Sequence, residues 1–462
     1  MNHRGHLHFI GIAGYAMRGV ALAAQAMGYQ VTGSDVSAYP PGSDWLDDHS
    51  LAWWRKPAPE RLAGVDRIVI SGGTSPDYPE LVWAAEHKIP VVSFAEFAGE
   101  IMANEVRLVV AGTHGKTTTT SMITWILDSA GRRPDFLIGI QPLNLSSSVR
   151  LESGMVAVIE GDEYTASQLD RRPKFDYYHP DRLILTSLEM DHPDVFKDLS
   201  DIVSHFQRLV GGLKPGSYLY RWVGSAELQK LASPPGVIVK TYGVGAGDWR
   251  GEGVSYDQDG LSYDLACGDD RYGRLRLPLF GTHNVANSVA AAALLLDFGL
   301  TIKEIQQGFS SFLGAARRFQ LVSAPSAPIR IFDDYAHHPT EVMATIAAAK
   351  QHFGGRLIVA FRPHTYSRTQ ALLEEYRQAF TLADVAFVTD IEGAREKGQA
   401  QRVSGADIVQ GGVGNLFYEP DREQLIERLT TEARAGDTIL CMTVSGYDHL
   451  AETVATRLKP MV

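Results

Sequence analysis

The 462-residue sequence lacks the marks of several large classes of protein. Its two cysteines, Cys267 and Cys441, lie far apart, so no disulfide framework is expected, and a reducing, cytoplasmic compartment fits the composition. No run of about eighteen apolar residues occurs, which predicts a protein without a membrane span. The 43 basic residues are fewer than the 54 acidic ones and form no dense cluster, which argues against a nucleic-acid partner.

The chain does contain a regular alternation of strand and helix patterns. Short apolar runs, such as residues 66–71 and 329–332, are each followed by a helical pattern, here 79–87 and 339–352. This alternation is typical of α/β domains with mostly parallel sheets, and the length favours about three of them. Residues 236–277, rich in glycine and tyrosine, predict a small antiparallel excursion.

A glycine loop lies between a buried-strand pattern at residues 108–111 and a helical pattern at 121–127. Strand, glycine loop and helix form the context of a phosphate-binding loop, although Val110 stands where the general pattern has a glycine. Lys116 would approach the β- and γ-phosphates, and Thr117 is placed to hold Mg²⁺. The simpler alternative is a tight turn with a surface lysine. Nucleotide binding is favoured, by Gly112, Thr113, His114, Gly115, Lys116, Thr117 and Thr118.

Three acids follow the next strand pattern, at residues 155–159. They are Glu160, Asp162 and Glu163, and the carboxyl end of a strand is where open α/β sheets keep their ligands. Because a phosphate loop needs Mg²⁺, metal binding is favoured over a solvated loop. His192 follows a further strand pattern and is open to three roles, as a metal ligand, a general base or a structural histidine.

The first 35 residues form a strand–helix–strand pattern with Gly11 and Gly14 in the first turn and Asp35 at the end of the second strand. The pattern is similar to a dinucleotide-binding unit, in which an acid about 20 residues after the glycines takes a ribose hydroxyl. The G-x-G-x-x-G spacing is broken, so NAD binding and a plain strand–helix turn both fit it.

Seven stretches follow one another along nearly the whole chain, at residues 8–12, 112–117, 160–163, 191–192, 283–284, 317–319 and 333–339. Together they resemble the Mur ligases, which are ATP-dependent, amide-forming enzymes of peptidoglycan metabolism. The resemblance implies a three-domain α/β fold, each domain a mostly parallel sheet with flanking helices, in a monomer or a homodimer. The domains would be a UDP-sugar-binding domain at 1–104, an ATPase domain at 105–318 and a Rossmann-like domain at 319–462.

The resemblance also implies roles for individual residues and two cofactors, ATP and Mg²⁺. Lys116 would clamp the β- and γ-phosphates. Thr117 and Glu163 would hold one Mg²⁺, and His192 would hold a second Mg²⁺ near the acyl phosphate. His337 would orient the acyl phosphate or the incoming amine. For ATP, the implied contacts are Asn284 with adenine, Asp334 with ribose and Arg317 or Arg318 with phosphate. The first domain would bind UDP rather than NAD, through Gly11, Gly14, Ser34 and Asp35. The acceptor would contact His364 and Arg368.

The acceptor is the point on which branches of the family differ. Two stretches resemble the murein peptide ligases: residues 33–41, and Glu163-Tyr164 followed by residues 169–175. Residues 362–369 resemble the motif of the L-alanine-adding members, but Thr365 stands where these have an arginine. We therefore expect ligation of UDP-N-acetylmuramate to the tripeptide L-Ala-γ-D-Glu-meso-diaminopimelate through an acyl phosphate, in peptidoglycan recycling. The alternative is ligation to L-alanine in peptidoglycan biosynthesis.

Two rival functions belong to other classes. A nicotinamide oxidoreductase would need a complete glycine fingerprint and would have no use for Lys116. A non-catalytic regulator that binds a UDP-sugar on the same fold would be expected to have damaged metal and phosphate motifs, and here both motifs are intact.

Overall fold

The computed structural model describes residues 4–38, 42–103, 105–152, 154–193, 195–396, 403–445, 447 and 449–458. Residues 39–41, which belong to one of the stretches that favour a peptide acceptor, lie outside these ranges. The described strands form three sheets, of five, ten and six strands. None of the helices in these ranges is long and apolar enough to cross a membrane.

The first sheet is entirely parallel, in the order β3-β2-β1-β4-β5. Its central strand β1 is buried after its first residue, and α1 packs its small residues Ala21 and Ala24 in the core. The elements are β1 (His6–Ile10), α1 (Tyr15–Ala26), β2 (Gln30–Ser34), α2 (Gly42–Asp48), β3 (Ala52–Trp54), β4 (Arg67–Ile70), α3 (Pro79–Glu86), β5 (Val91–Ser93) and α4 (Phe94–Ile101).

The second sheet has the order β15-β14-β13-β12-β11-β10-β6-β9-β7-β8. Strand β6 is fully buried after its second residue, as its valine-rich sequence predicts for the middle of a parallel sheet. The strands are β6 (Val106–Ala111), β7 (Asp135–Leu137), β8 (Val149–Arg150), β9 (Val156–Gly161), β10 (Arg182–Leu185), β11 (Tyr218–Trp222), β12 (Ile238–Val244), β13 (Trp249–Asp257), β14 (Gly260–Cys267) and β15 (Asp270–Leu277). The helices are α5 (Lys116–Ser129), α6 (Leu199–Gly211), α7 (Ala226–Lys230), α8 (Thr282–Asp297) and α9 (Ile302–Ser310).

The antiparallel excursion predicted at residues 236–277 is smaller than expected. Strand β12 pairs parallel with both β11 and β13, so it extends the parallel part of the sheet. Only β13, β14 and β15 pair antiparallel there, through short turns. The sequence pattern could not separate β12 from its neighbours, because half-buried strands alternate in the same way whatever the direction of the partner.

The third sheet has the order β16-β17-β21-β18-β19-β20, and only β16 runs antiparallel to its neighbour. The strands are β16 (Gln320–Leu321), β17 (Arg330–Asp334), β18 (Leu357–Phe361), β19 (Val385–Val388), β20 (Leu416–Tyr418) and β21 (Thr438–Met442). The helices are α10 (Pro339–His352), α11 (Tyr366–Ala371), α12 (Leu373–Ala379), α13 (Gly405–Gln410), α14 (Arg422–Glu432) and α15 (Leu450–Leu458).

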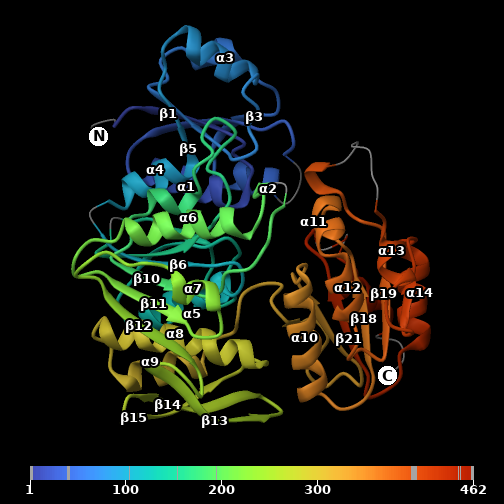
Figure 1. Ribbon diagram of the computed structural model, residues 1–462. Helices are drawn as coiled ribbons and strands as arrows, with labels where there is room; N and C mark the ends of the chain where they lie inside the picture. The colour runs from blue at the N-terminus through green and yellow to red at the C-terminus, as the bar shows by residue number, and fades with distance from the viewer. Residues whose placement is uncertain are drawn as a thin grey trace.

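The arrangement of the sheets brings distant segments together (Figure 1). Strand β6 lies between β9 and β10 with all three parallel, so the loops that follow them emerge side by side. These loops carry the phosphate loop, Asp162, Glu163 and His192, and Glu160 lies at the end of β9 itself. Helix α10 lies on the side of the C-terminal region that faces the central one, and it forms the opposite wall of the site.

Candidate active site

The phosphate loop depends on its two glycines. Gly112 has φ +139° and Gly115 has φ +79°, values that L-residues with a side chain rarely adopt. A Cβ on Gly112 would lie 2.2 Å from Oγ1 of Thr186, and one on Gly115 would lie 2.7 Å from Oδ1 of Asn287. The main chain is therefore drawn close to its neighbours, and α5 begins directly after the loop at Lys116.

Lys116 is folded back over the loop that it follows. Its Nζ donates hydrogen bonds to the carbonyl oxygens of Gly112 at 2.6 Å and Thr113 at 3.1 Å. The same atom lies 2.8 Å from Oε2 of Glu163. Burial by itself would lower the pKa of Lys116, but Glu163 and the nearby Asp162 raise it overall, so the amine stays charged. A cation is thus held at the place where phosphate charge would be bound.

The oxygen and nitrogen ligands expected for Mg²⁺ lie around this lysine. Oγ1 of Thr117 donates to Oε1 of Glu160 at 2.7 Å, and Oε1 of the buried Glu163 lies 3.5 Å from Nε2 of His192. The sequence predicts that Thr117 and Glu163 hold one Mg²⁺; the hydroxyl of Thr117 also contacts Glu160, which adds a third oxygen-bearing side chain to the set. Carboxylate and hydroxyl oxygens suit Mg²⁺, so this set fits the ion.

The predicted acceptor motif meets these groups from the C-terminal side. Arg368 is only 2% exposed, and its Nε donates to Oδ1 of Asp191 at 2.7 Å. Its Nη2 lies 3.2 Å from Nδ1 of His192, and its Nη1 lies 3.4 Å from Nδ1 of His364. Arg368 of the predicted acceptor motif is therefore in direct contact with His192, a predicted metal ligand, although the two residues are 176 positions apart in the sequence.

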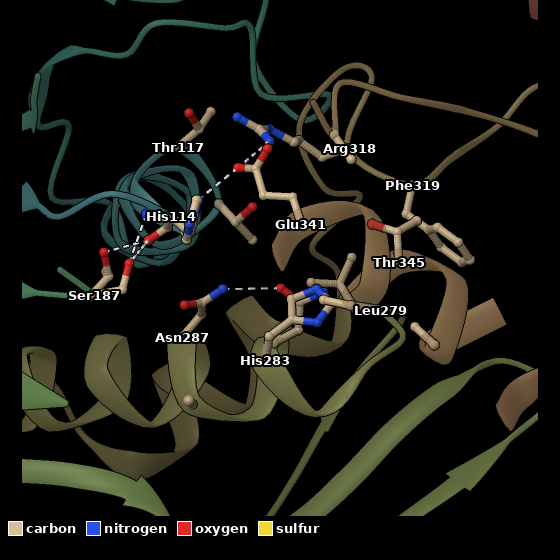
Figure 2. A pocket seen from close by; sticks show the side chains of 18 of the residues that line it. His114, Thr117, Ser187, Leu279, His283, Asn287, Arg318, Phe319, Glu341 and Thr345 are labelled. Atoms are coloured by element: carbon tan, nitrogen blue, oxygen red, sulfur yellow. Dashed lines mark hydrogen bonds and ion pairs between the residues drawn. The ribbon is translucent and has the colours of Figure 1, made fainter. Parts of the chain in front are cut away.

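A cavity opens beside the phosphate loop between the central and C-terminal regions (Figure 2). It encloses about 1110 Å³ of empty space, part of it open to solvent. One end carries the loop residues His114, Gly115, Thr117 and Thr118, and the other end is mostly apolar. Such a shape suits a nucleotide with its phosphates at the loop. The apolar end includes Trp222, Leu279, Phe280, Phe319, Ala344 and Ala348.

Of the four residues outside the phosphate loop that are expected to bind ATP, three line this cavity. Nδ2 of Asn284 donates to the carbonyl oxygen of Phe280 at 2.8 Å. The Asp334 carboxylate accepts the main-chain N–H groups of Phe319 and Ala336, both at 2.6 Å, and burial raises its pKa to about 6. Arg318 also lines the cavity. In this arrangement Asp334 is occupied in holding the turn that follows β17.

Arg317 and His337 lie outside the cavity wall. Nε of Arg317 donates to Oδ2 of Asp333 at 2.8 Å, and its guanidinium also reaches main-chain carbonyls after β21. Nδ1 of His337 lies 3.0 Å from the carbonyl oxygen of Tyr335. Burial, and then the charge of Arg368, lower the pKa of His337 to about 3, so the ring is neutral at physiological pH.

The glycine turn of the first region is built differently from the phosphate loop. Gly11 has φ +81°, and a Cβ there would lie 2.6 Å from Oγ of Ser71, but Gly14 has an ordinary φ of −56°. The Asp35 carboxylate accepts the main-chain N–H of Ala13 at 3.0 Å. Ser34 is fully buried and donates to Glu80, so its hydroxyl faces the interior.

Three buried or half-buried glutamates make several of the hydrogen bonds and ion pairs around these sites and were not predicted as site residues. Glu80 accepts hydrogen bonds from Ser34, Trp54 and the main chain of Ala58. Glu189 and Glu341 lie on either side of His114, at 3.6 and 3.2 Å. A sequence signal existed for the last two, because Glu189 precedes the Asp-His pair and Glu341 follows the His-His-Pro motif.

Comparisons with known proteins agree with this geometry. Three family models match consecutive parts of the chain: the Mur ligase family catalytic domain at residues 6–106, the Mur ligase middle domain at 110–295 and the Mur ligase glutamate ligase domain at 317–443. This chain is 33% identical to the UDP-N-acetylmuramate–L-alanine ligase of Geotalea uraniireducens and 35% identical to that of Rubrobacter xylanophilus. Each alignment covers 98% of this chain, and 98% and 100% of the relative.

Solved structures give the same result. A murein peptide ligase from Psychrobacter arcticus is 27% identical, with a TM-score of 0.73 and 99% of both chains covered. A UDP-N-acetylmuramate–alanine ligase from Thermotoga maritima shares the fold with a TM-score of 0.80 at 22% identity, covering 99% of this chain and all of its own. From the three family models and these full-length similarities, we conclude that the chain belongs to the Mur ligase family of ATP-dependent, amide-forming ligases.

Proposed function

We propose that this enzyme joins UDP-N-acetylmuramate to L-alanine at the expense of ATP. The observation that carries the proposal is the full-length similarity to ligases of that name, at 33% and 35% identity over 98% of this chain. The sequence by itself favours the tripeptide acceptor, and these relatives support the alternative, L-alanine, better. The site supports the reaction class, because a phosphate loop, a metal-ligand set and the acceptor motif meet at one place.

Catalysis would rest on charge compensation and positioning. The lactyl carboxylate of the UDP-sugar would attack the γ-phosphorus of ATP, forming an acyl phosphate and releasing ADP. The acceptor amine would then attack the acyl carbon, losing a proton as inorganic phosphate leaves. Lys116 would compensate the phosphate charge in the first step. The neutral ring of His337 would orient the amine or the acyl phosphate by hydrogen bonding.

The remaining assignments concern ligand binding. Thr117, Glu163 and His192 would hold Mg²⁺, with Glu160 as an additional candidate, and the ion would screen phosphate charge. Arg318 is preferred over Arg317 for the nucleotide phosphates, because only Arg318 lines the cavity. The UDP moiety would lie at the glycine turn of the first region. Tyr15 of that region donates to Oε1 of Gln141 at 2.8 Å, which links the turn to the central region.

The tripeptide L-Ala-γ-D-Glu-meso-diaminopimelate is the second candidate acceptor, and two observations favour it. Thr365 replaces an arginine that would be a natural partner for the carboxylate of a small amino acid. Arg368 is buried against Asp191 and is therefore a poor substitute for that arginine. The murein peptide ligase structure from Psychrobacter arcticus, similar over the whole chain, also supports this candidate.

The deciding experiment measures phosphate release with UDP-N-acetylmuramate and ATP while L-alanine and the tripeptide are offered in parallel. We expect a higher kcat/KM for L-alanine. A higher value for the tripeptide would overturn the proposed acceptor, and Thr365→Arg should then move the preference towards L-alanine. Absence of phosphate release with both acceptors would reject the UDP-sugar substrate.

A further inference from the structure

Glu341 lies in the first turn of α10, in the wall of the nucleotide cavity (Figure 2). Its Oε1 lies 3.2 Å from Nδ1 of His114 in the phosphate loop and 3.7 Å from Nη1 of Arg318 in the segment between the domains. Its Oε2 accepts the main-chain N–H of His337 at 3.2 Å. One carboxylate thus connects three residues that have candidate roles in the site.

The charges around this carboxylate compensate one another. The Glu341 side chain is 13% exposed; burial would raise its pKa, but His337, His114 and Arg318 hold it well below the usual range. Burial would also lower the pKa of His114, yet Glu189 and Glu341 raise it to about 9. At neutral pH the carboxylate therefore joins an imidazolium of the central domain to a guanidinium in the segment between the domains.

Two further side chains at the start of α10 contact the central domain. Oγ1 of Thr340 donates to Oε2 of Glu189 at 2.8 Å, and Nε2 of His338 lies 3.1 Å from the carbonyl oxygen of Met190. Together with Glu341, these contacts attach the first turn of α10 to the phosphate loop and to the loop after β10. Glu341 is the charged member of this group.

A metal ion is a competing explanation for the cluster. Ligand atoms of His114, Glu189 and His338 lie within 4.8 Å of one another. However, Nδ1 of His338 accepts the main-chain N–H of Thr340 at 3.3 Å, and its Nε2 faces the carbonyl oxygen of Met190. Because both ring nitrogens are occupied, His338 has no lone pair left for a metal. The cluster is better explained as a contact between domains.

We propose that Glu341 is a positioning residue that makes nucleotide binding depend on docking of the C-terminal domain. The proposal rests on the proposed function, in which the phosphate loop binds ATP. With α10 docked, Glu341 sets the positions of His114 and Arg318 at the phosphate end of the cavity. With α10 undocked, both cations lose their shared partner, and the cavity loses one wall.

The test compares Glu341→Gln with a matched control, Glu423→Gln. The amide keeps the size of the side chain and an acceptor for the His337 N–H, but it removes the charge. Glu423 also lies in the first turn of a C-terminal helix, α14, and pairs with Arg457, but it is exposed and far along the sequence from the cavity motifs. Calorimetry measures the affinity for Mg·ADP, and small-angle scattering measures the shape with ADP bound.

We expect Glu341→Gln to weaken ADP binding roughly 10- to 100-fold, the usual effect of losing a hydrogen bond to a charged group. It should also give a more extended particle with ADP, while the KM for the UDP-sugar stays unchanged. The double variant with His114→Gln should lose less than the sum of the two single variants, because the two residues share one contact. A purely structural role would not produce this selective pattern.

Equal ADP affinity and scattering in Glu341→Gln and Glu423→Gln would overturn the proposal. If Glu341→Gln does not fold, Glu341→Asp replaces it, because it keeps the charge on a shorter side chain; wild-type ADP affinity in that variant would also overturn the proposal. ADP binding requires neither acceptor nor UDP-sugar. If the wild type had no ligase activity, the proposed function would be rejected, and the role of Glu341 in ADP binding could still be tested by calorimetry.

Discussion

The molecule contains two glycine turns between a parallel strand and a helix, and they differ in what surrounds them. The turn after β6 has two glycines in positive-φ conformations, a lysine and an acidic cluster. The turn after β1 has one such glycine, Gly11, and no charged side chain from Ile12 to Ala16. Its acid, Asp35, holds the turn through the N–H of Ala13.

The comparison shows that two similar turns can differ in the charge around them, which fits the different ligands that we propose for them. The loop after β6 combines main-chain N–H groups with Lys116, which suits a triphosphate and its metal. The turn after β1 offers main-chain groups and a helix N-terminus without a charged side chain between Ile12 and Ala16, which suits the smaller charge of a nucleotide sugar. The following predictions test this difference, and they are ordered from the largest expected effect to the smallest.

Lys116→Ala removes the charge that distinguishes the two turns. Turnover should fall by roughly 10²–10³-fold, the usual effect of losing one group that stabilises charge in the transition state. Phosphate release in the presence of both substrates measures the effect, and thermal unfolding checks that the fold is kept. Because Glu163 loses its ion-pair partner in this variant, Lys116→Ala/Glu163→Gln should recover the stability that is lost but no activity. Near-normal turnover in Lys116→Ala would show that the loop does not bind phosphate.

Alanine substitutions separate the glycines of the two turns. Gly115→Ala places a Cβ 2.7 Å from Asn287 at a positive φ and should cost about 1–3 kcal/mol of unfolding free energy. Gly14→Ala meets nothing closer than 3.3 Å at an ordinary φ and should stay within about 0.5 kcal/mol of the wild type. Urea unfolding measures both values. Equal costs would remove the structural distinction drawn here.

Glu163→Gln and Glu160→Gln distinguish the two candidate metal ligands of the charged loop. We expect Glu163→Gln to raise the Mg²⁺ concentration required for half-maximal activity about tenfold, since an amide oxygen is a weaker ligand than a carboxylate. The effect of Glu160→Gln should be smaller, because its amide oxygen can still accept from Thr117 or Gly139. Titration with Mg²⁺ gives both values, and the reverse order would assign the metal to Glu160.

Asp35→Asn is the corresponding change in the uncharged turn. One hydrogen bond to the main chain should weaken, raising the KM for the UDP-sugar roughly 2- to 10-fold with the KM for ATP unchanged. Steady-state kinetics with each substrate varied in turn provides the measurement. An equal rise in both KM values would contradict the assignment of separate ligands to the two turns.

Much of the fold could be predicted from the sequence, because strands such as β6, β10 and β18 are short apolar runs with turn signals on both sides. The phosphate loop can also be recognised from the sequence, since its chemistry lies within the seven consecutive residues from Gly112 to Thr118. The domain boundaries at 1–104, 105–318 and 319–462 and the individual site roles stay predictions.

Other features depend on contacts between distant segments, which local patterns do not encode. The pairing of Thr117 with Glu160 depends on how the first turn of α5 lies against the end of β9. Arg317 and Arg318 are neighbours with the same side chain, yet only Arg318 lines the cavity. Glu341 carried a weak signal near a recognisable motif, but its partner His114 lies 227 residues away.

The nucleotide cavity has a kinetic consequence, because its walls come from two domains. A ligand that contacts both walls would dissociate more readily once the domains separate. The rate of ADP release would therefore rise with the rate of domain opening. In multiple turnovers the fastest variants would be those with a loosened interface, even where their affinity for nucleotide is lower.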